Sequence, residues 1–378
     1  MNADYLLDIP YTNQFYENLN PWLLNYIRAI HGYSLPSLDK GFTYCELGCG
    51  NGLSLNVLAA ANPAASFFGV DMNPEHIAAA RNLAQDGELT NLNLIEENFA
   101  DLSRHNLPDF DFITLHGVFS WISPQMRATI TAFIEQRLKP GGLVMISYNT
   151  PQGWAVTAPI RDFLRSFVFS GEGDLLEKAK NGLMELQFLR DSGAAYFQLN
   201  PLAASILDSF FQLDLRYIVH EFLTPYWQPM YFSEVLGQMR DVGLEYVGSY
   251  PVANNYGEVS VPKELHNYFK GLPDRTTVEM RKDFVNMTLF RSDIYLKPDR
   301  GVRNPDILEG YRDLVFGSVL LPAKFSFKVP AAFGGIINLE GDIFKKLVQI
   351  LAGTSCRAAD IFNHSDLVSY NPNELRSA

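Results

Sequence analysis

Short apolar runs alternate with helix-like stretches along the first part of the chain. The apolar runs cover residues 43–47, 66–70, 92–95, 110–115 and 143–148. They are too uniformly apolar for a sheet with one face in water, so they predict parallel strands buried on both faces. Between them, Asn73-Pro74-Glu75 and Ser123-Pro124 supply the capping side chain and the first-turn proline that begin helices. Five strand–helix units in this order predict a doubly wound α/β domain.

Beyond this domain the alternation stops, and residues 160–220 have the apolar spacing of helices, with a break expected at Asn181-Gly182. Strand–helix alternation then returns, with strands predicted over 244–252 and 287–296. We infer that the helical block is an insertion and that residues 230–297 complete the sheet. An insertion after the fifth strand would lie over the carboxyl edge of the sheet, where ligands bind in such domains.

The C-terminal segment carries weaker signals. A strand is predicted over 325–329, and helices over 341–352 and 358–363 resemble a helix-turn-helix. Residues 341–378 contain four Lys/Arg and four Asp/Glu, so this part lacks the positive charge of a DNA reader. A small unit for packing or for homodimer formation is the favoured interpretation. The predicted division is 1–155 for a ligand-binding core, 156–298 for a second region with its helical insert at about 160–225, and 299–378 for an accessory domain.

Length and charge narrow the classes of function. A chain of 378 residues suits two or three domains of about 100–200 residues each. The formal charge of −12, without a local Lys/Arg cluster, disfavours nucleic acid as a partner. No apolar stretch approaches the roughly 18 residues of a membrane span, so a cytoplasmic enzyme without a membrane partner is expected. Cys45, Cys49 and Cys356 have neither disulfide-framework nor zinc-type spacing, and no metal site is predicted.

The strongest motif is Glu46-Leu47-Gly48-Cys49-Gly50-Asn51-Gly52, between the first strand and the next helix. Alternate glycines let the backbone turn sharply and approach a ligand closely, and the following helix offers unpaired N–H groups. An anionic or zwitterionic ligand is therefore expected. The dinucleotide fingerprint would need a glycine at position 53, where this chain has Leu53, so a dinucleotide is the second choice.

Polar residues also follow the second and third predicted strands. Asp71 ends the second strand, where an acid can accept two hydrogen bonds from a ribose diol; a helix-capping aspartate is the alternative. The third strand ends in Glu97-Asn98-Phe99-Ala100-Asp101, where a polar side chain and a backbone N–H can bind an adenine edge. The ligand is thus expected to carry a ribose and a carboxylate-like end.

Together these residues resemble the class I S-adenosylmethionine-dependent methyltransferases. The likeness rests on the acid-x-Gly-x-Gly-x-Gly loop, the acid after the second strand, and Pro140-Gly141-Gly142 before the fifth. The resemblance implies a Rossmann-like sheet that binds S-adenosyl-L-methionine, with the glycine loop on its methionine part, the strand-two acid on its ribose and the strand-three residues on its adenine. The cofactor-binding residues that it implies are Glu46, Gly48, Cys49, Gly50, Gly52, Asp71, Met72, Asn98, Phe99 and His116.

A narrower resemblance covers about residues 8–297. Its motifs are His116-Gly117-Val118-Phe119-Ser120-Trp121, Ser147-Tyr148-Asn149-Thr150, Gln152-Gly153-Trp154, His220-Glu221-Phe222-Leu223, Tyr231-Phe232 and Phe290-Arg291. They are similar to bacterial methyltransferases that carry a methyltransferase regulatory domain, a group that includes rickettsial protein-lysine methyltransferases. The resemblance makes a protein lysine amine one candidate acceptor.

Methyl transfer needs a positioned acceptor lone pair, and a base only if the acceptor is protonated, as a lysine amine is. His116 is the candidate catalytic residue, with a hydrogen-bonded structural histidine as the alternative. Tyr11, Asn149 and Trp154 are expected on the substrate side, with core packing as the alternative for Trp154. His220-Glu221 is interpreted as a structural pair.

Three functions stay open from the sequence. The first is a methyltransferase whose acceptor is unknown. A nucleobase or a glutamine is disfavoured as the acceptor, because the chain lacks the Asp/Asn-Pro-Pro-Tyr motif of the enzymes that methylate them. The second is a catalytically silent regulatory protein that binds S-adenosylmethionine. The third, less favoured, is a nucleotide-dependent oxidoreductase.

Overall fold

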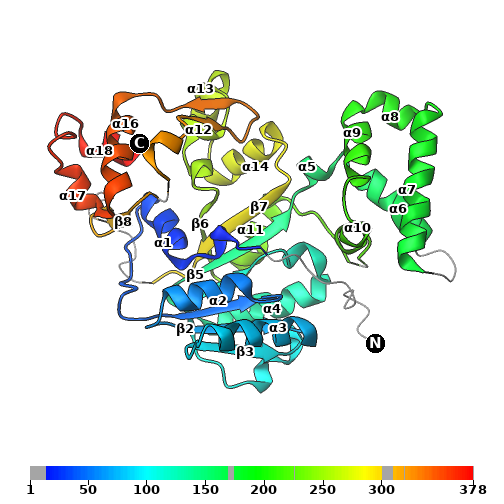
Figure 1. The fold of residues 1–378 in the computed structure, drawn as a ribbon, viewed down its shortest axis with the longest axis horizontal. Coiled ribbons are helices and arrows are strands. Elements are labelled where there is room, and N and C mark those ends of the chain that lie inside the picture. Colours follow the sequence, from blue (N-terminus) through cyan, green and yellow to red (C-terminus); the bar gives the residue numbers. More distant parts are fainter. Residues whose placement is uncertain (1–13, 169–173, 225, 300–309, 319, 378) are drawn as a thin grey trace.

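The computed structural model describes residues 14–168, 174–224, 226–299, 310–318 and 320–377. Within them, a seven-stranded sheet lies at the centre of the molecule, in the order β3-β2-β1-β4-β5-β7-β6 (Figure 1). Its strands are β1 Thr43–Leu47, β2 Ser66–Asp71, β3 Leu92–Glu96, β4 Phe110–Leu115, β5 Leu138–Asn149, β6 Glu245–Tyr250 and β7 Phe290–Leu296. β1 to β5 pair in parallel, and β7 runs antiparallel between β5 and β6. The predicted parallel sheet, and its completion by residues 230–297, are confirmed.

Helices cover both faces of the sheet. They are α1 Pro21–Ile30, α2 Leu53–Ala61, α3 Pro74–Asp86, α4 Pro124–Arg137, α11 Phe232–Asp241 and α14 Arg275–Val285. Because successive strand residues point to opposite faces, each face has its own hydrophobic core. On one face Tyr44 packs in a cluster with Leu24 of α1 and Leu55 of α2. On the other, Ile113 shares a cluster with Ile130 of α4 and Val235 of α11.

β5 begins earlier than the sequence predicts. The expected turn at Lys139-Pro140-Gly141-Gly142 lies inside the strand as a bulge, because β4 pairs first with Leu138 and then with Leu143. Gly141 has a φ of +78°, and its N–H donates to the carbonyl of Lys297 at 2.8 Å. The antiparallel neighbour β7 therefore holds residues that would otherwise form a free turn.

The helical insert forms a lobe beside the sheet, at the right of Figure 1. It contains α6 Ala158–Val168, α7 Leu175–Asp191, α8 Ala195–Leu199, α9 Pro201–Phe210 and α10 Leu215–Phe222, and it has a hydrophobic core of its own. The break expected at Asn181-Gly182 is wrong, because α7 continues through it. A Cβ at Gly182 would lie 3.0 Å from Leu164 of α6, so the glycine allows close contact between two helices.

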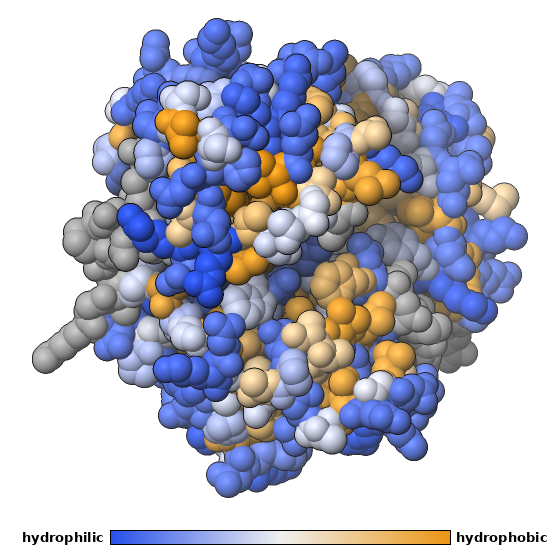
Figure 2. Space-filling view, turned by 60° about the vertical axis from the view of Figure 1, so that its left-hand side comes forward, coloured by the Kyte–Doolittle hydropathy of each residue, from blue (hydrophilic) through white to orange (hydrophobic). Residues whose placement is uncertain are grey.

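The C-terminal segment packs on α1. Its elements are β8 Val315–Phe316, β9 Lys328–Pro330, β10 Ile336–Asn338, α16 Asp342–Gly353, β11 Cys356–Arg357, α17 Ala358–Phe362 and α18 Pro372–Ser377. The strand predicted over 325–329 is displaced to β9, where it pairs with β10 across a turn. An apolar cavity of about 430 Å³ lies between this segment and Tyr26 of α1. Figure 2 turns this side of the molecule forward and shows hydrophobic residues gathered around a hollow.

The two α-helices predicted near the C-terminus, over 341–352 and 358–363, are confirmed as α16 and α17. Across the described residues, no helix combines the length and the apolar character that a bilayer crossing requires.

Candidate functional site

A cavity opens at the carboxyl edge of the parallel strands. Its walls come from the loops after β1, β2, β3 and β4, from residues 14–16, and from Thr224 just after the helical insert. Nine of the ten predicted cofactor residues line it: Glu46, Gly48, Cys49, Gly50, Asp71, Met72, Asn98, Phe99 and His116. Four separate stretches of sequence therefore meet in one place.

The glycine loop turns through three residues with positive φ, which L side chains rarely adopt. Gly48, Gly50 and Gly52 have φ values of +78°, +53° and +70°. A Cβ at Gly50 would meet nothing within 4 Å, so its backbone borders open space. A Cβ at Gly52 would lie 2.6 Å from the Cβ of Ala80 in α3. Gly52 does not line the cavity, and its lack of a side chain lets α2 pack on α3, so its contact with the cofactor stays a prediction.

Asp71 braces the glycine loop and also faces the cavity. One carboxylate oxygen accepts from the N–H of Gly50 at 2.9 Å, and the other from the N–H of Asn73 at 2.9 Å. The cap of α3 is Asn73, whose side chain accepts from the N–H of Glu75, so Asp71 is not the helix cap. A carboxylate oxygen has two acceptor sites, and Asp71 keeps capacity for ligand hydroxyls.

Glu46 is buried beside the loop, and within the described part of the chain its Oε2 atom has no hydrogen-bond partner. Burial, with the nearby charge of Asp71, raises the pKa of Glu46 to about 8. A buried carboxylate without a partner is unfavourable, and a cationic ligand group would relieve it. Burial likewise raises the pKa of the Cys49 thiol well above its usual range, so this cysteine is not a thiolate nucleophile.

His116 lies at the end of β4 and is held from three sides. The side-chain amide of Asn18 donates to its Nδ1 at 2.9 Å and also contacts the hydroxyl of Ser292 on β7 at 3.0 Å. The ring centroid of Tyr16 lies 4.1 Å from that of His116, and that of Phe290 lies 5.5 Å away. Burial lowers the pKa of His116 to about 4, so the ring is neutral at pH 7. Since Nδ1 accepts, the ring proton is on Nε2, and the imidazole is a hydrogen-bond donor rather than a base.

The predicted substrate residues fare differently. Tyr11 lies outside the described residues. Trp154 is 5% exposed and packs against Trp227, with ring centroids 4.7 Å apart, in the core of the helical lobe. This packing agrees with the alternative given for Trp154, and its contact with a substrate stays a prediction.

Asn149 is also buried and does not line the cavity. Its backbone N–H donates to the hydroxyl of Ser120, and its carbonyl accepts from Met230, so it ties β5 to neighbouring loops. Its side-chain Nδ2 has no hydrogen-bond partner among the described residues. The side chains of His220 and Glu221 are outside what the structure describes.

Sequence reasoning missed Tyr16, Asn18 and Thr224. Tyr16 and Asn18 lie in a segment without a motif, and they reach His116 only through the tertiary fold. Thr224 directly follows His220-Glu221-Phe222-Leu223, so that motif was a signal that could have located it. The cavity wall thus includes the end of the inserted helices.

Comparison with known proteins places two regions in families. Residues 38–165 match a family described as "Methyltransferase domain", and residues 214–297 match "Predicted methyltransferase regulatory domain". An uncharacterized protein of Synechocystis sp. is 31% identical over 378 residues, which is 100% of this chain and 74% of that protein. An uncharacterized protein of Rickettsia prowazekii is 27% identical over 310 residues, or 79% of this chain and 54% of that protein.

Among solved structures, PKMT2 from Rickettsia typhi in complex with AdoHcy superposes with a TM-score of 0.72. The two chains are 22% identical, and the match covers 97% of this chain and 74% of PKMT2. The shared fold extends over the sheet, the insert and the C-terminal segment.

Proposed function

Because the chain belongs to the S-adenosylmethionine-dependent methyltransferases that carry a methyltransferase regulatory domain, we propose that it methylates the side-chain amine of a protein lysine. The methyl donor is S-adenosyl-L-methionine. The acceptor is the part proposed here, and the observation that carries it is the wall formed by Tyr16 and His116 at the cavity.

The cavity fits the cofactor. The unpartnered carboxylate of Glu46 would take the amino group of the methionine part, and Asp71 would accept from the ribose hydroxyls. Asn98 and Phe99, after β3, would contact the adenine. When bound, S-adenosylmethionine supplies a methyl group on a positively charged sulfur, which is already activated for transfer.

The wall beside the glycine loop suits an alkyl amine. The rings of Tyr16 and His116 pack against each other at the cavity in a tilted arrangement, and the ring of Phe290 contacts His116 edge-on. Aromatic faces bind alkylammonium groups. Removal from water lowers the pKa of a lysine amine, so more of it is present as the neutral amine, which is the nucleophile. The Nε2–H of His116 can donate to a carbonyl oxygen of the acceptor or to a carboxylate oxygen of the cofactor, and thereby orient it.

The name of the structural neighbour PKMT2 and its complex with AdoHcy agree with this proposal. The negative net charge of the chain also favours approach of a lysine-rich protein.

The test is transfer of tritiated methyl groups from S-adenosylmethionine to proteins of a cell lysate, followed by hydrolysis and amino-acid analysis. We expect the label in ε-methylated lysine. Tyr16→Leu should reduce the rate while AdoHcy affinity is retained, and Tyr217→Leu, an exposed tyrosine of the helical lobe, should leave both unchanged. Label in another residue, in nucleic acid or in small molecules would refute a lysine acceptor. Absence of label despite tight AdoHcy binding would instead favour a silent regulatory protein.

A further inference from the structure

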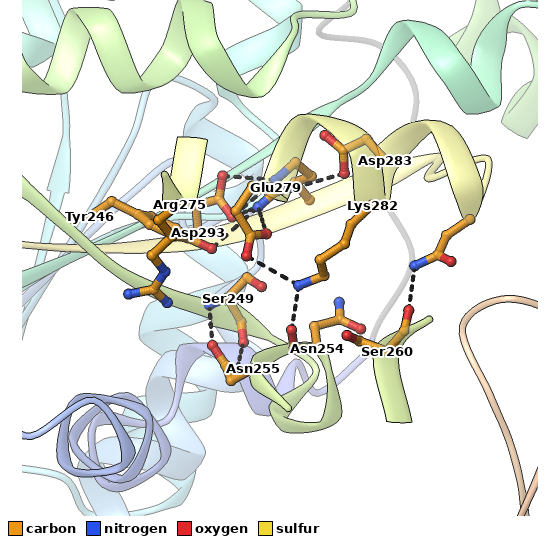
Figure 3. A network of polar contacts seen from close by, with 12 residues as sticks. Tyr246, Ser249, Asn254, Asn255, Ser260, Arg275, Glu279, Lys282, Asp283 and Asp293 are labelled. Carbon is orange, nitrogen blue, oxygen red and sulfur yellow. Dashed lines mark hydrogen bonds and ion pairs between the residues drawn. The ribbon is translucent and has the colours of Figure 1, made fainter. Parts of the chain in front are cut away.

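A second cavity lies within the regulatory region, away from the glycine loop. It has a volume of about 250 Å³ and is enclosed by α14, by η4 (Val252–Asn255), by α12 (Gly257–Ser260), by α13 (His266–Lys270) and by His31 after α1. Its basic and imidazole side chains are His31, His266, Lys270, Arg275 and Lys282, against the two carboxylates of Glu258 and Glu279. Figure 3 shows Arg275, Lys282, Asn255 and Ser260 in this part of the fold.

Glu279 forms ion pairs with two cations and lies near a third, Arg275. Its two carboxylate oxygens contact the Lys282 ammonium at 3.1 Å and the Arg291 guanidinium at 3.0 Å. Although burial alone would raise it, Lys282 and Arg291 lower the pKa of Glu279 to about 2. Arg291 is also paired with Asp283 at 2.7 Å and with Asp293 at 2.9 Å, whereas Arg275 lies near Glu279 without an ion-pair contact to it among the described residues.

Arg275 has no carboxylate within ion-pair distance in the described part of the chain, although Glu279 is near enough to feel its charge. Its guanidinium lies over the ring of Tyr246, 4.6 Å from the centroid, and contacts Nε2 of His31 at 3.0 Å. Burial and Arg275 lower the pKa of His31 to about 4, so His31 is neutral. Among the described residues, the contact to His31 is the one hydrogen bond of this guanidinium, so its other N–H groups can donate to a ligand, and the planar fork of arginine suits an oxyanion.

Ser260 adds an independent observation. It is 1% exposed, lies in the wall of this cavity, and its hydroxyl has no hydrogen-bond partner among the residues that the structure describes. A buried hydroxyl without a partner costs about 1–3 kcal/mol, so native structures rarely leave one unsatisfied. The carbonyl of Ser260 accepts from Asn286 at 2.9 Å, which fixes the backbone that carries the hydroxyl.

We propose that this cavity binds a small oxyanion, the phosphate or carboxylate group of a metabolite, through Arg275, the hydroxyl of Ser260 and Lys270 at the mouth. A volume of about 250 Å³ is slightly below the usual range of small-molecule pockets, so the ligand is the size of a short dicarboxylate or a sugar phosphate. This binding site is separate from the methyl-transfer cavity and does not depend on the identity of the methyl acceptor.

Contacts connect the second cavity with the first. Lys282 forms an ion pair with Glu279, and Glu279 forms a second ion pair with Arg291 of β7. The neighbours of Arg291 along the strand are Phe290, which packs on His116, and Ser292, which contacts Asn18. An anion that alters the position of α14 therefore has a contiguous route to the residues around His116.

The experiment uses the whole chain and two probes, inorganic phosphate and succinate, at constant ionic strength. Calorimetry and the thermal unfolding midpoint are measured for each. We expect saturable binding of at least one probe at one site per chain, and the preferred probe distinguishes a phosphate ligand from a carboxylate ligand. Arg275→Met should weaken that binding by about tenfold or more, and Ser260→Ala by less.

Arg281→Met is the matched control, because Arg281 lies on the same helix but is exposed and contacts Tyr268. It should leave anion binding unchanged. Arg275→Lys keeps the charge but loses the forked geometry, and should bind with intermediate affinity. Unchanged AdoHcy affinity verifies that each variant is folded. The proposal is overturned if neither probe binds saturably, or if Arg275→Met and Arg281→Met reduce binding equally.

Discussion

Two carboxylates line the methyl-transfer cavity, and their surroundings give them different roles. Asp71 is fixed by two backbone N–H groups and so presents its oxygens in a set direction. Glu46 is 4% exposed, and one of its oxygens has no hydrogen-bond partner among the described residues. The first is thus preorganised for neutral hydroxyls, and the second needs a cation.

We expect Asp71→Ala to weaken AdoHcy binding by about 1–3 kcal/mol, because hydrogen bonds to a charged group are lost. Titration calorimetry measures this change. Asp86→Ala, at the exposed end of α3, is the matched control and should bind as the unaltered protein does. An unchanged affinity in Asp71→Ala would remove Asp71 from the cofactor site.

Glu46 predicts a pH dependence of cofactor binding. Its folded-state pKa is raised from 4.5 to about 8, so in the free protein it is protonated below about pH 8. Its contribution to folding stability is accordingly lost as the pH rises from 4.5 through 8. Pairing with the ligand's amino group needs the carboxylate, so below pH 8 binding must release a proton, and AdoHcy affinity should rise as the pH approaches 8.

Calorimetric titrations across this pH range, for the protein and for Glu46→Gln, separate this contribution from titration of the ligand itself. The Gln variant should bind more weakly and show a flatter pH profile, because it has no proton to release. Parallel profiles for the two proteins would refute the pairing of Glu46 with a cation.

At the scale of an element, the loop between β1 and α2 contains three glycines in three different environments. Gly48 would place a Cβ 2.4 Å from Val118, and Gly52 would place one 2.6 Å from Ala80, whereas a Cβ at Gly50 meets nothing within 4 Å. The first two are required by packing inside the protein. Gly50 instead borders the cavity, where a side chain would occupy the space of a bound cofactor.

This difference gives opposite expectations for two substitutions. Gly50→Val should leave a folded protein, at a cost of roughly 1–2 kcal/mol for its positive φ, and should abolish AdoHcy binding by filling the cavity wall. Gly52→Val should lower the unfolding midpoint much more, because its side chain collides with α3. Thermal unfolding and AdoHcy titration of both variants measure this. A folded Gly50→Val that binds normally would contradict the assignment of the loop.

The sequence predicted elements whose signals are local. Apolar runs and helix caps predicted the five parallel strands, and the glycine loop and Asp71 predicted most of one cavity wall. The wall around His116 was not predictable in this way. Asn18 contacts His116, which is 98 positions away in the sequence, and Ser292, which is 274 positions away. Contacts over such separations leave no local periodicity in the sequence. The packing of Trp154 could not be decided from the sequence, because a buried aromatic near a ligand edge gives the same pattern whether it packs or binds.

At the scale of the whole molecule, the helical lobe has its own hydrophobic core but shares the cofactor cavity. Thr224, at the end of the lobe, lines that cavity. Beyond it the chain returns to the sheet, where the backbone N–H of Gln228 donates to Ser120 and that of Met230 donates to Asn149. The lobe can therefore lose packing without loss of the glycine loop. Regions with separate cores open with separate free energies.

Trp154 tests this separation, because it belongs to the core of the lobe yet follows β5 directly. Trp154→Ala should destabilise the lobe by about 3–5 kcal/mol, as large-to-small changes at buried aromatics do. Amide hydrogen exchange should accelerate in α6 to α10 while α2 and α3 stay protected and AdoHcy affinity is kept. Trp22→Ala, at a half-exposed tryptophan of α1, is the control and should change neither. If the lobe instead stays protected and only the KM for the acceptor rises, Trp154 contacts the substrate, and its packing is secondary.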